Sequence, residues 1–314
     1  MAMTLADAAK LSNDYMLKGI YETLIKTSPL MSMMPFETLN GTAYTVNRED
    51  EANMPTVAFR QVDSVWTEST GKTVQKSYHL SILGGDCDVD NFLLASQQDV
   101  NQLMAEQVAM KTKIMAHVFD QKAIYGDEDN YEFDGFHVMV GDAGSDVQVH
   151  AGSGSTGGAL NLMLLDEAID KCTAGKPDFI LMNKTIRRWF DAYLRSVGSY
   201  VTERDDYGNR FGIYNDIPVL TSDWLLQTEA ISGGAYSAAT GGVTSSIFVG
   251  YLGAGDGVTG LQNGGITYET WDRLEQKDAS RTRIKWYVGM AQRSIKSLVR
   301  IDGVTAAAVT ATGS

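Results

Sequence analysis

The sequence has 314 residues, 44% of them hydrophobic, which suffices for one large globular domain or two to three small ones. Its formal net charge of −13 argues against tight binding of duplex nucleic acid, because such binding draws most of its affinity from a basic surface. An acidic wall can still enclose packed DNA and repel it, so the charge does not exclude a container for DNA.

The N-terminal region is expected to form an amphipathic helix over residues 4–26. Apolar residues recur there at helical spacing. Pro29 and Pro35 then interrupt the pattern, and the methionines between them are interpreted as gap-filling core residues. An isolated copy would expose the apolar stripe of residues 5–25, which predicts association with other copies.

Two strands follow, with a long polar segment between them. Ala43–Val46 and Ser77–Leu83 have the composition of strands, whereas Asn53–Gln75 shows no helical pattern. A two-stranded excursion of this length is marginally stable by itself. We therefore expect it to lie on a neighbour, which a partner subunit could supply.

The strongest local pattern predicts a long helix over residues 91–125. Apolar residues recur mostly at four-residue steps from Val100 to Phe119, and Gly126 is a suitable stop. Asp90 is a candidate N-cap. About 30 helical residues would span about 45 Å. So long a helix with a continuous apolar stripe is interpreted as a spine on which other elements lie.

The rest of the chain alternates between helices and strands. Helices are expected at residues 160–172 and 184–197, the second capped by Asn183. Strands are expected at residues 178–182, 217–220, 247–252, 265–269, 282–290 and 297–301. Pro218 suggests that its strand lies at a sheet edge. The other expectations are a turn at Asp205–Asn209, a small-residue loop at Gly233–Thr244 and a loose tail from Thr305.

The segment Gly152–Gly157 matches the glycine fingerprint of dinucleotide-binding loops, after a strand-like stretch and before a predicted helix. The preceding Asp146–His150 alternates polar and apolar residues, unlike a strand buried on both faces of a parallel sheet. The acidic residue expected after the second strand is missing, since Asn183 stands there. A flexible loop is therefore favoured over a nucleotide-binding enzyme that uses Gly152–Gly157.

No metal site, cofactor or catalytic centre is expected, so the chain is interpreted as a non-enzyme. Asp86, Asp88 and Asp90 alternate and would share one exposed strand face. Asn91 and Gln97 replace the glycine and glutamate that a calcium loop requires. The four histidines lack zinc-site spacing, and the sequence has no Gly-x-Ser-x-Gly elbow.

The cysteines and the N-terminus indicate a cytoplasmic protein. Cys87 and Cys172 do not make a disulfide framework, so a reducing compartment is the default. Cys172 near a helix C-terminus is poorly placed for a thiolate. No apolar run approaches about 18 residues, and residues 1–14 lack the pattern of a secretory signal.

The order of these elements resembles that of the major capsid proteins of tailed bacteriophages, which have the Hong Kong 97-type fold. The resemblance covers nearly the whole chain, and the segments that carry it are Ser28–Phe36, Val65–Glu68 with Tyr78–Leu83, Ala123–Gly126 with Phe133–Phe136, Phe179–Asn183 with Ile217–Asp223, and Thr282–Val304. In that order they resemble the end of the N-terminal arm, the extension loop, the passage out of the spine helix, two parts of the axial domain, and the final strands.

The resemblance implies an α+β Hong Kong 97-type capsid fold with an N-terminal arm, an extended β-hairpin loop, a peripheral domain with a long spine helix, and an axial domain. The implied boundaries are 1–38 for the arm, 39–90 for the extension loop, 91–176 for the peripheral domain with the spine helix, 177–263 for the axial domain, and 264–314 for the return strands of the peripheral domain and the C-terminal tail.

The function that the resemblance implies is that of a major capsid protein. Pentamers and hexamers would assemble into an icosahedral shell around phage double-stranded DNA, without sequence-specific DNA contact and without a membrane. Assembly would occur in the host cytoplasm, with the chain located in the virion capsid. Some relatives carry a long helical scaffolding segment before the arm, whereas here the arm begins with the first residues. A separate scaffolding protein, or assembly without one, is therefore expected, together with a portal. The alternatives are an encapsulin-like nanocompartment shell, a tail or baseplate protein, and the nucleotide-binding enzyme.

Overall fold

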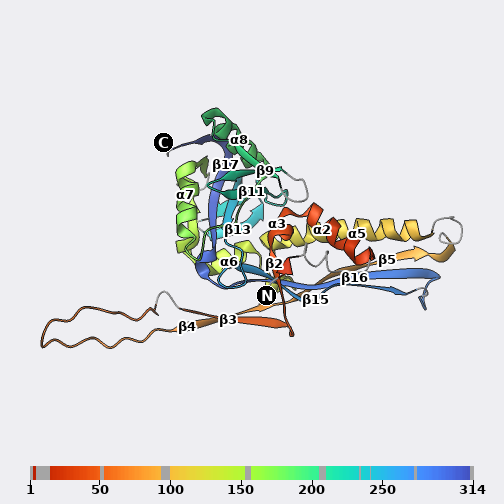
Figure 1. Ribbon diagram of the computed structural model, residues 1–314, viewed down its shortest axis with the longest axis horizontal. Coiled ribbons are helices and arrows are strands. Elements are labelled where there is room, and N and C mark those ends of the chain that lie inside the picture. Colours follow the sequence, from red (N-terminus) through yellow and green to blue (C-terminus); the bar gives the residue numbers. More distant parts are fainter. Residues whose placement is uncertain are drawn as a thin grey trace.

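The computed structural model describes residues 3–4, 15–49, 53–92, 100–152, 157–204, 210–232, 235–240, 242–271 and 274–311. They form two sheets with their helices and a hairpin that projects far from the body (Figure 1). Within these ranges, no helix is long and apolar enough to cross a membrane.

One sheet has five strands and carries the long helix. Its strand order is β1 (Met3–Thr4), β2 (Pro35–Thr38), β15 (Val258–Trp271), β16 (Ala279–Gln292) and β5 (Ser81–Asp90). β15 and β16 form a long antiparallel hairpin, and β5 pairs with the outer side of β16. Along β16, Ile284, Trp286 and Val288 are buried, while Arg283 and Lys285 lie on the opposite face. This period of two gives the sheet one apolar face and one charged face.

Helix α5 (Val100–Tyr125) packs on the apolar face of this sheet. Phe119 lies 5.4 Å from Trp286 and 6.2 Å from Phe36 between ring centroids, so α5, β16 and β2 share one aromatic core. The 26 residues of α5 correspond to about 39 Å. The predicted spine helix is thus confirmed over residues 100–125.

Both predicted ends of the spine segment carry the expected signals. The Asp90 carboxylate accepts a hydrogen bond from the Phe92 amide at 2.8 Å, at the beginning of the predicted helix, although residues 93–99 lie outside the described part. Gly126 follows the last helical residue, and its amide still bonds to the Lys122 carbonyl at 2.7 Å.

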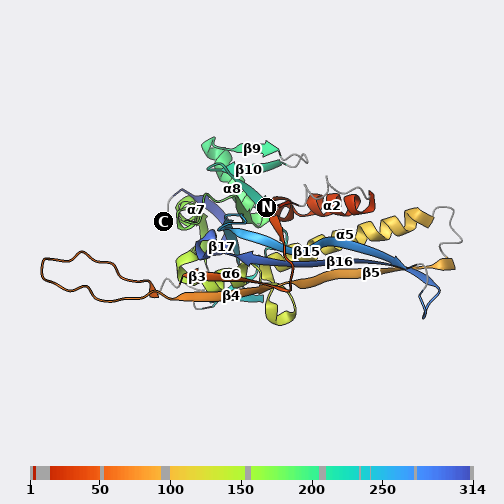
Figure 2. The same ribbon diagram turned by 60° about the horizontal axis from the view of Figure 1, so that its bottom comes forward.

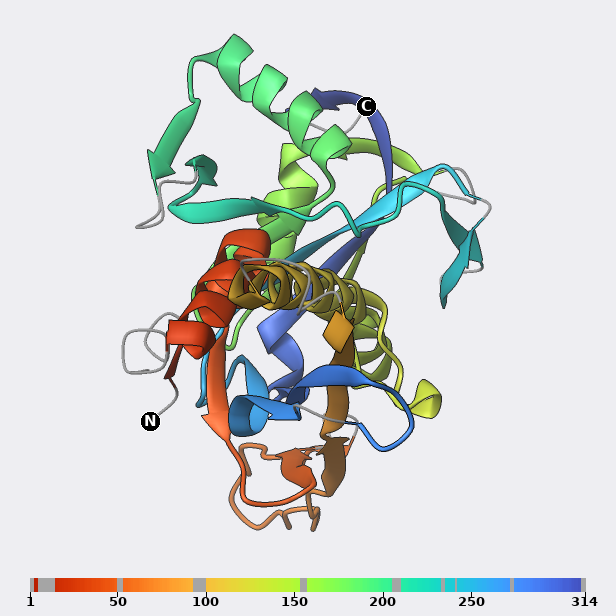
Figure 3. The ribbon, with the colours of Figure 1, turned by 90° about the vertical axis from the view of Figure 1, so that its right-hand side faces the viewer.

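The N-terminal helix lies beside the spine. Helix α2 (Tyr15–Thr27) contacts α5, and α3 (Pro29–Met33) follows it (Figure 3). Ile20, Tyr21 and Leu24 are buried. The expected exposure of the apolar stripe is therefore wrong for these residues, because the stripe packs on the same chain. The remaining part of that expectation, residues 5–14, lies outside the described residues.

The second sheet has ten strands. Its main order is β13 (Ala235–Thr240), β12 (Glu229–Ser232), β14 (Thr244–Gly250), β8 (Phe179–Met182), β11 (Ile217–Thr221), β10 (Arg210–Tyr214) and β9 (Val201–Arg204). Off this path, β17 (Leu298–Thr310) pairs with β14, β6 (Gln148–His150) and β7 (Gly158–Asn161). Helices α6 (Phe136–Ala143), α7 (Leu162–Lys171) and α8 (Lys184–Val197) all pack on β17. Short 3-10 helices lie at Glu128–Asn130, Ser145–Val147 and Ile295–Ser297.

Most predicted elements of this half are confirmed. Helices α7 and α8 lie where the sequence placed them, and the Asn183 side chain accepts from the Thr185 amide at 2.9 Å as the predicted N-cap. The predicted strands correspond to β8, β11, β14, β15, β16 and β17. The predicted turn at Asp205–Asn209 lies outside the described residues.

Three predictions are wrong. The strand with Pro218 is internal, because β11 lies between β8 and β10; its parallel pairing with β8 begins only at Val219, so the missing proline N–H costs no bond there. The expected loop at Gly233–Thr244 contains strand β13, which forms a hairpin with β12. The expected loose tail from Thr305 continues β17 to Thr310 and pairs with β7.

The last 51 residues contribute to both sheets. Most of β15 and all of β16 belong to the five-stranded sheet, whereas β17 belongs to the ten-stranded one. The division of the chain into an arm, an extension loop, a peripheral domain and an axial domain remains a prediction.

The projecting element is a narrow hairpin. β3 (Ala43–Glu49) and β4 (Thr73–His79) pair antiparallel, and the chain between them extends far beyond the sheets (Figures 1 and 2). The strands predicted at residues 43–46 and 77–83 are confirmed, and the second passes from β4 into β5 at Leu80.

Candidate assembly surfaces

The projecting hairpin is fixed to the body at its base. The Arg48 guanidinium donates hydrogen bonds to the Tyr78 hydroxyl and to the Gln292 carbonyl at the end of β16. The Lys76 ammonium lies 2.6 Å from the Asp142 carboxylate and 3.4 Å from that of Asp134. These contacts join β3 and β4 to the five-stranded sheet and to α6, so the direction of the hairpin is set by the body.

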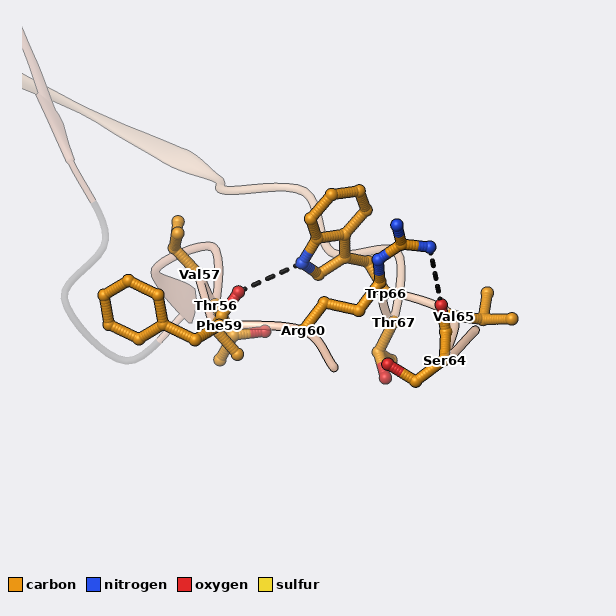
Figure 4. A pocket seen from close by; sticks show the side chains of 9 residues that line it. Thr56, Val57, Phe59, Arg60, Ser64, Val65, Trp66 and Thr67 are labelled. Atoms are coloured by element: carbon orange, nitrogen blue, oxygen red, sulfur yellow. Dashed lines mark hydrogen bonds between the residues drawn. The ribbon is translucent and has the colours of Figure 1, made fainter. Parts of the chain in front are cut away.

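The outer loop, residues 53–72, has a defined shape although it touches little else. The Trp66 indole donates to the Ala58 carbonyl at 3.0 Å across the loop (Figure 4). The Arg60 guanidinium lies 4.5 Å from the Trp66 ring centre and donates to the Ser64 carbonyl at 2.7 Å. At the tip, Asp63 adopts a φ of 69°, which aspartate tolerates in a tight turn. Contacts within the loop therefore hold its two runs together.

This loop presents bare apolar side chains to solvent. Val57, Val65 and Val62 are 96%, 92% and 91% exposed, and Phe59 is fully exposed. Full burial of one such side chain contributes about 1.5–3 kcal/mol. Exposed apolar patches of this kind mark interaction sites in soluble proteins. The sequence interpretation missed these residues because it described the whole segment as polar, although Val57-Ala58-Phe59 and Val65-Trp66 are apolar runs within it.

The charged face of the five-stranded sheet consists of cross-strand ion pairs. Asp86 pairs with Arg283 and Asp88 with Arg281, each at 2.6 Å between β5 and β16. The hydrogen bond from Arg283 holds the pKa of the Asp86 carboxyl below its ordinary value. The predicted sharing of one strand face is confirmed for Asp86 and Asp88. The sequence interpretation did not predict the arginine partners of these two carboxylates.

A buried polar network joins the spine to the second sheet. Glu229 of β12 accepts hydrogen bonds from the Tyr125 hydroxyl of α5 and the Ser246 hydroxyl of β14, both at 2.5 Å. His137 of α6 lies 3.4 Å from Glu229 and 3.2 Å from the buried Arg300 guanidinium. Burial lowers the pKa of His137 to about 4, so this histidine is neutral at pH 7. The network joins helices α5 and α6 to three strands of the ten-stranded sheet, and its charged and titratable members Glu229, His137 and Arg300 are buried.

The other histidines are dispersed. His79 lies 3.3 Å from Glu128, His117 contacts the Trp224 ring, and His150 lies 2.6 Å from Asp302. Among the residues that the structure describes, no cluster of three metal-ligating side chains occurs.

The glycine loop lacks the context of a nucleotide site. Gly157 leads into strand β7 rather than directly into a helix, and β6 and β7 both pair in parallel with β17. A dinucleotide-binding loop must open a helix, whose N-terminus receives the pyrophosphate. A side chain at Gly157, where φ is 68°, would overlap the Gly303 carbonyl, so packing explains this glycine. Residues 153–156 lie outside the described part.

Both cysteines are free and buried. Burial raises the pKa of Cys172 to about 11 and also raises that of Cys87. Neither thiol is activated as a nucleophile, in agreement with the expectation for Cys172.

Comparison with protein families decides the class of this protein. The family model described as SU10 major capsid protein matches residues 7–223, more than two thirds of the 314 residues. The chain belongs to this family. As a major capsid protein, it is a shell-forming structural protein. A search among curated proteins finds no match.

Solved structures agree with this capsid protein in fold. The SrpI encapsulin of Synechococcus elongatus PCC 7942 is 16% identical, with all of both chains covered and a TM-score of 0.67. The capsid of a native GTA particle is 14% identical over 88% of this chain and 90% of that one, with a TM-score of 0.55. A chain of Microbacterium phage Oxtober96 is 12% identical over 87% and 90%, also with a TM-score of 0.55. The expected Hong Kong 97-type fold is thereby confirmed.

Proposed function

We propose that this capsid protein assembles through pentamers and hexamers into the closed icosahedral shell of a virion, around double-stranded DNA. The observation that carries the proposal is the projecting loop, whose apolar side chains are bare although its shape is fixed. In a monomer, the apolar side chains of this loop stay exposed to water and contribute no stability. They stabilise the protein only when a neighbouring copy covers them.

The loop of one copy can contact a different surface of the next copy, so the contact itself need not be symmetric. We expect the loop of one copy to lie on the body of the next, where Met110 and Ile114 of α5 are exposed one helical turn apart. A contact between two different surfaces repeats around an axis and closes a ring. Rings of five and six from one chain require only a small change of angle at this contact.

The proposed shell encloses its contents without specific chemical recognition of them. The net charge of −13 suits a container that repels packed DNA and makes no sequence-specific contact with it. The proposed partners are a separate scaffolding protein and a portal, with assembly in the host cytoplasm and no membrane. The proposed role is structural rather than catalytic. We also propose the five-part division at residues 1–38, 39–90, 91–176, 177–263 and 264–314.

A second candidate is a nanocompartment shell that houses a protein. The similarity to the SrpI encapsulin, over all of both chains, favours it as the alternative. The two candidates share every contact between copies and differ in contents. Purified particles that hold nuclease-protected genomic DNA support the virion shell, and particles that hold one protein cargo support the nanocompartment.

Negative-stain electron microscopy of the chain expressed alone, with sizing chromatography, tests assembly itself. We expect closed particles, or a mixture of pentamers and hexamers. A monomer or dimer that does not respond to salt or protein concentration contradicts the proposal for the chain by itself. Coexpression with the scaffolding protein of the same genome then tests assembly under the proposed conditions, and a monomer there rejects the shell function.

A further inference from the structure

Helix α8 has a basic face in an otherwise acidic chain. Its 14 residues include four cationic side chains and one acidic side chain. Arg188 and Arg195 are exposed and lie seven residues apart, so they point to the same side of the helix, two turns from each other. Arg187 differs, because it lies 3.5 Å from Asp191 within the helix.

The side chains of this face have few partners in their own chain. Arg195 lies over the Tyr200 ring at 5.2 Å, and Trp189 is 38% exposed. Arg188 forms no hydrogen bond or ion pair with any residue in the described ranges. Arginine beside a partly exposed tryptophan is typical of protein interfaces.

Helix α7 has an exposed face of opposite charge. Met163, Glu167 and Asp170 follow one another at steps of four and three residues and are all exposed, so they form one stripe. Asp166 beside them is held by the Tyr214 hydroxyl at 2.8 Å. The stripe thus presents two carboxylates and one thioether to solvent, and the Glu167 carboxylate also lies 3.3 Å from the Lys171 ammonium within the helix.

We propose that α8 of one copy docks against α7 of the next copy in the ring, with Arg188 and Arg195 facing Glu167 and Asp170. This proposal rests on the proposed shell function and names one of its contacts. Both helices pack on β17 but occupy different parts of the sheet surface (Figure 1). The contact therefore joins two different surfaces, as a ring of identical copies requires. Charge complementarity selects a second copy as the partner, since each copy carries both faces.

The apolar residues of the two faces also match. Trp189 follows Arg188 in sequence and lies about 100° around the helix from it, at the edge of the basic face, and Met163 is 58% exposed one turn before Glu167. A thioether makes favourable contacts with an aromatic ring. Docking would cover both side chains beside the ion pairs, and the charges would fix the register.

Charge reversal with rescue tests this contact. The variants are R188E/R195E on α8, E167R/D170R on α7, and the fourfold exchange that combines them. K18E/K277E is the control, because it changes the net charge as much as R188E/R195E at two other exposed positions outside the proposed contacts. Each protein is expressed under conditions in which the wild type assembles, and sizing chromatography measures the assembled fraction in about 0.15 M salt.

We expect R188E/R195E and E167R/D170R each to lower the assembled fraction about tenfold or more, the control to leave it unchanged, and the fourfold exchange to restore it. Circular dichroism of the unassembled fractions establishes that they are folded. Assembly of both double variants at the wild-type level overturns the proposal and leaves the shell function intact. Failure of the fourfold exchange to rescue overturns it as well. Normal R188E/R195E particles that lose copurifying nucleic acid also overturn it and assign the basic face to nucleic acid.

Discussion

The Ser28 hydroxyl donates a hydrogen bond to the buried carboxylate of Asp120 and so joins the beginning of α3 to α5. The same hydroxyl accepts from the Met31 amide at 3.0 Å as the N-cap of α3. A small cavity beside Asp120 reaches Leu181 and Ser222 of the ten-stranded sheet region. This contact therefore lies where the N-terminal helices, the spine helix and the second sheet meet.

The first prediction concerns the proton on Asp120. Burial raises its pKa to about 7, and the Ser28 hydrogen bond opposes that rise only in part. In the unfolded chain the pKa is about 3.9, so the folded chain binds the proton more tightly. The stability contributed by protonated Asp120 is fully present below about pH 4 and is lost as the pH rises through about 7.

We therefore expect Asp120→Asn, which is neutral at every pH, to stabilise the unassembled protein at pH 8. The gain should be on the order of a few kcal/mol and should shrink at pH 5. Urea unfolding at the two pH values measures it. Asp256→Asn, at an exposed carboxylate, is the control and should change neither value. An equal effect of Asp120→Asn at both pH values contradicts a titrating Asp120.

The second prediction concerns the projecting loop. Val57→Ser with Phe59→Ser removes two exposed apolar side chains that no contact in the same chain requires. We expect an unchanged melting temperature of the unassembled chain and a loss of about tenfold or more in the assembled fraction, since burial of each side chain contributes about 1.5–3 kcal/mol. Sizing chromatography and thermal melting measure the two quantities. Val243→Ser, at another exposed valine, should leave both unchanged, and normal assembly of the loop variant would reject the loop contact.

The sequence predicted well the elements whose local signals agree with their tertiary role. Helix α8 begins after Asn183, which caps it, and has apolar residues along one side. In β16, burial alternates strictly from Arg281 to Val288, so its composition and its place in the sheet indicate the same structure.

The positions of other elements depend on tertiary partners that no local sequence pattern reveals. Helix α6 has only eight residues and includes Gly141, so it is too short for its buried Phe136, Met139 and Val140 to establish a helical period in the sequence. The position of Pro218 suggested an edge strand, but only the pairing with β8 decides where the missing N–H matters. The arginine partners of β5 and the Tyr125–Glu229 contact could not be predicted, because each joins side chains that lie far apart in sequence. The exposure of the loop residues could not be predicted either, because it depends on how far the hairpin projects from the body.

The third prediction concerns the hydrogen bond between Tyr125 and Glu229. The Tyr125 hydroxyl donates to Glu229 and accepts from the Leu226 amide at 3.0 Å. Tyr125→Phe leaves the buried carboxylate short of one donor, so we expect a loss of about 1–3 kcal/mol in the free energy of unfolding. Urea unfolding at pH 7 measures it. Tyr131→Phe, at an exposed tyrosine, is the control, and equal stability of the two variants would mean that the network adds nothing to the junction.

The last prediction concerns the passage from the spine helix into α6. A Cβ at Gly126 would overlap the carbonyl oxygens of Phe133 and Lys122, and the Gly135 amide donates to the Gly126 carbonyl at 3.0 Å. Gly126→Ala must therefore push the returning chain away from the helix end, and we expect a loss of about 1–3 kcal/mol in the free energy of unfolding. Gly141→Ala is the matched control, because nothing lies within 4 Å of a Cβ there. Alanine at this helical site should be neutral or stabilising by up to about 1 kcal/mol. Equal melting temperatures for the two variants would show that the close approach at Gly126 relaxes without cost.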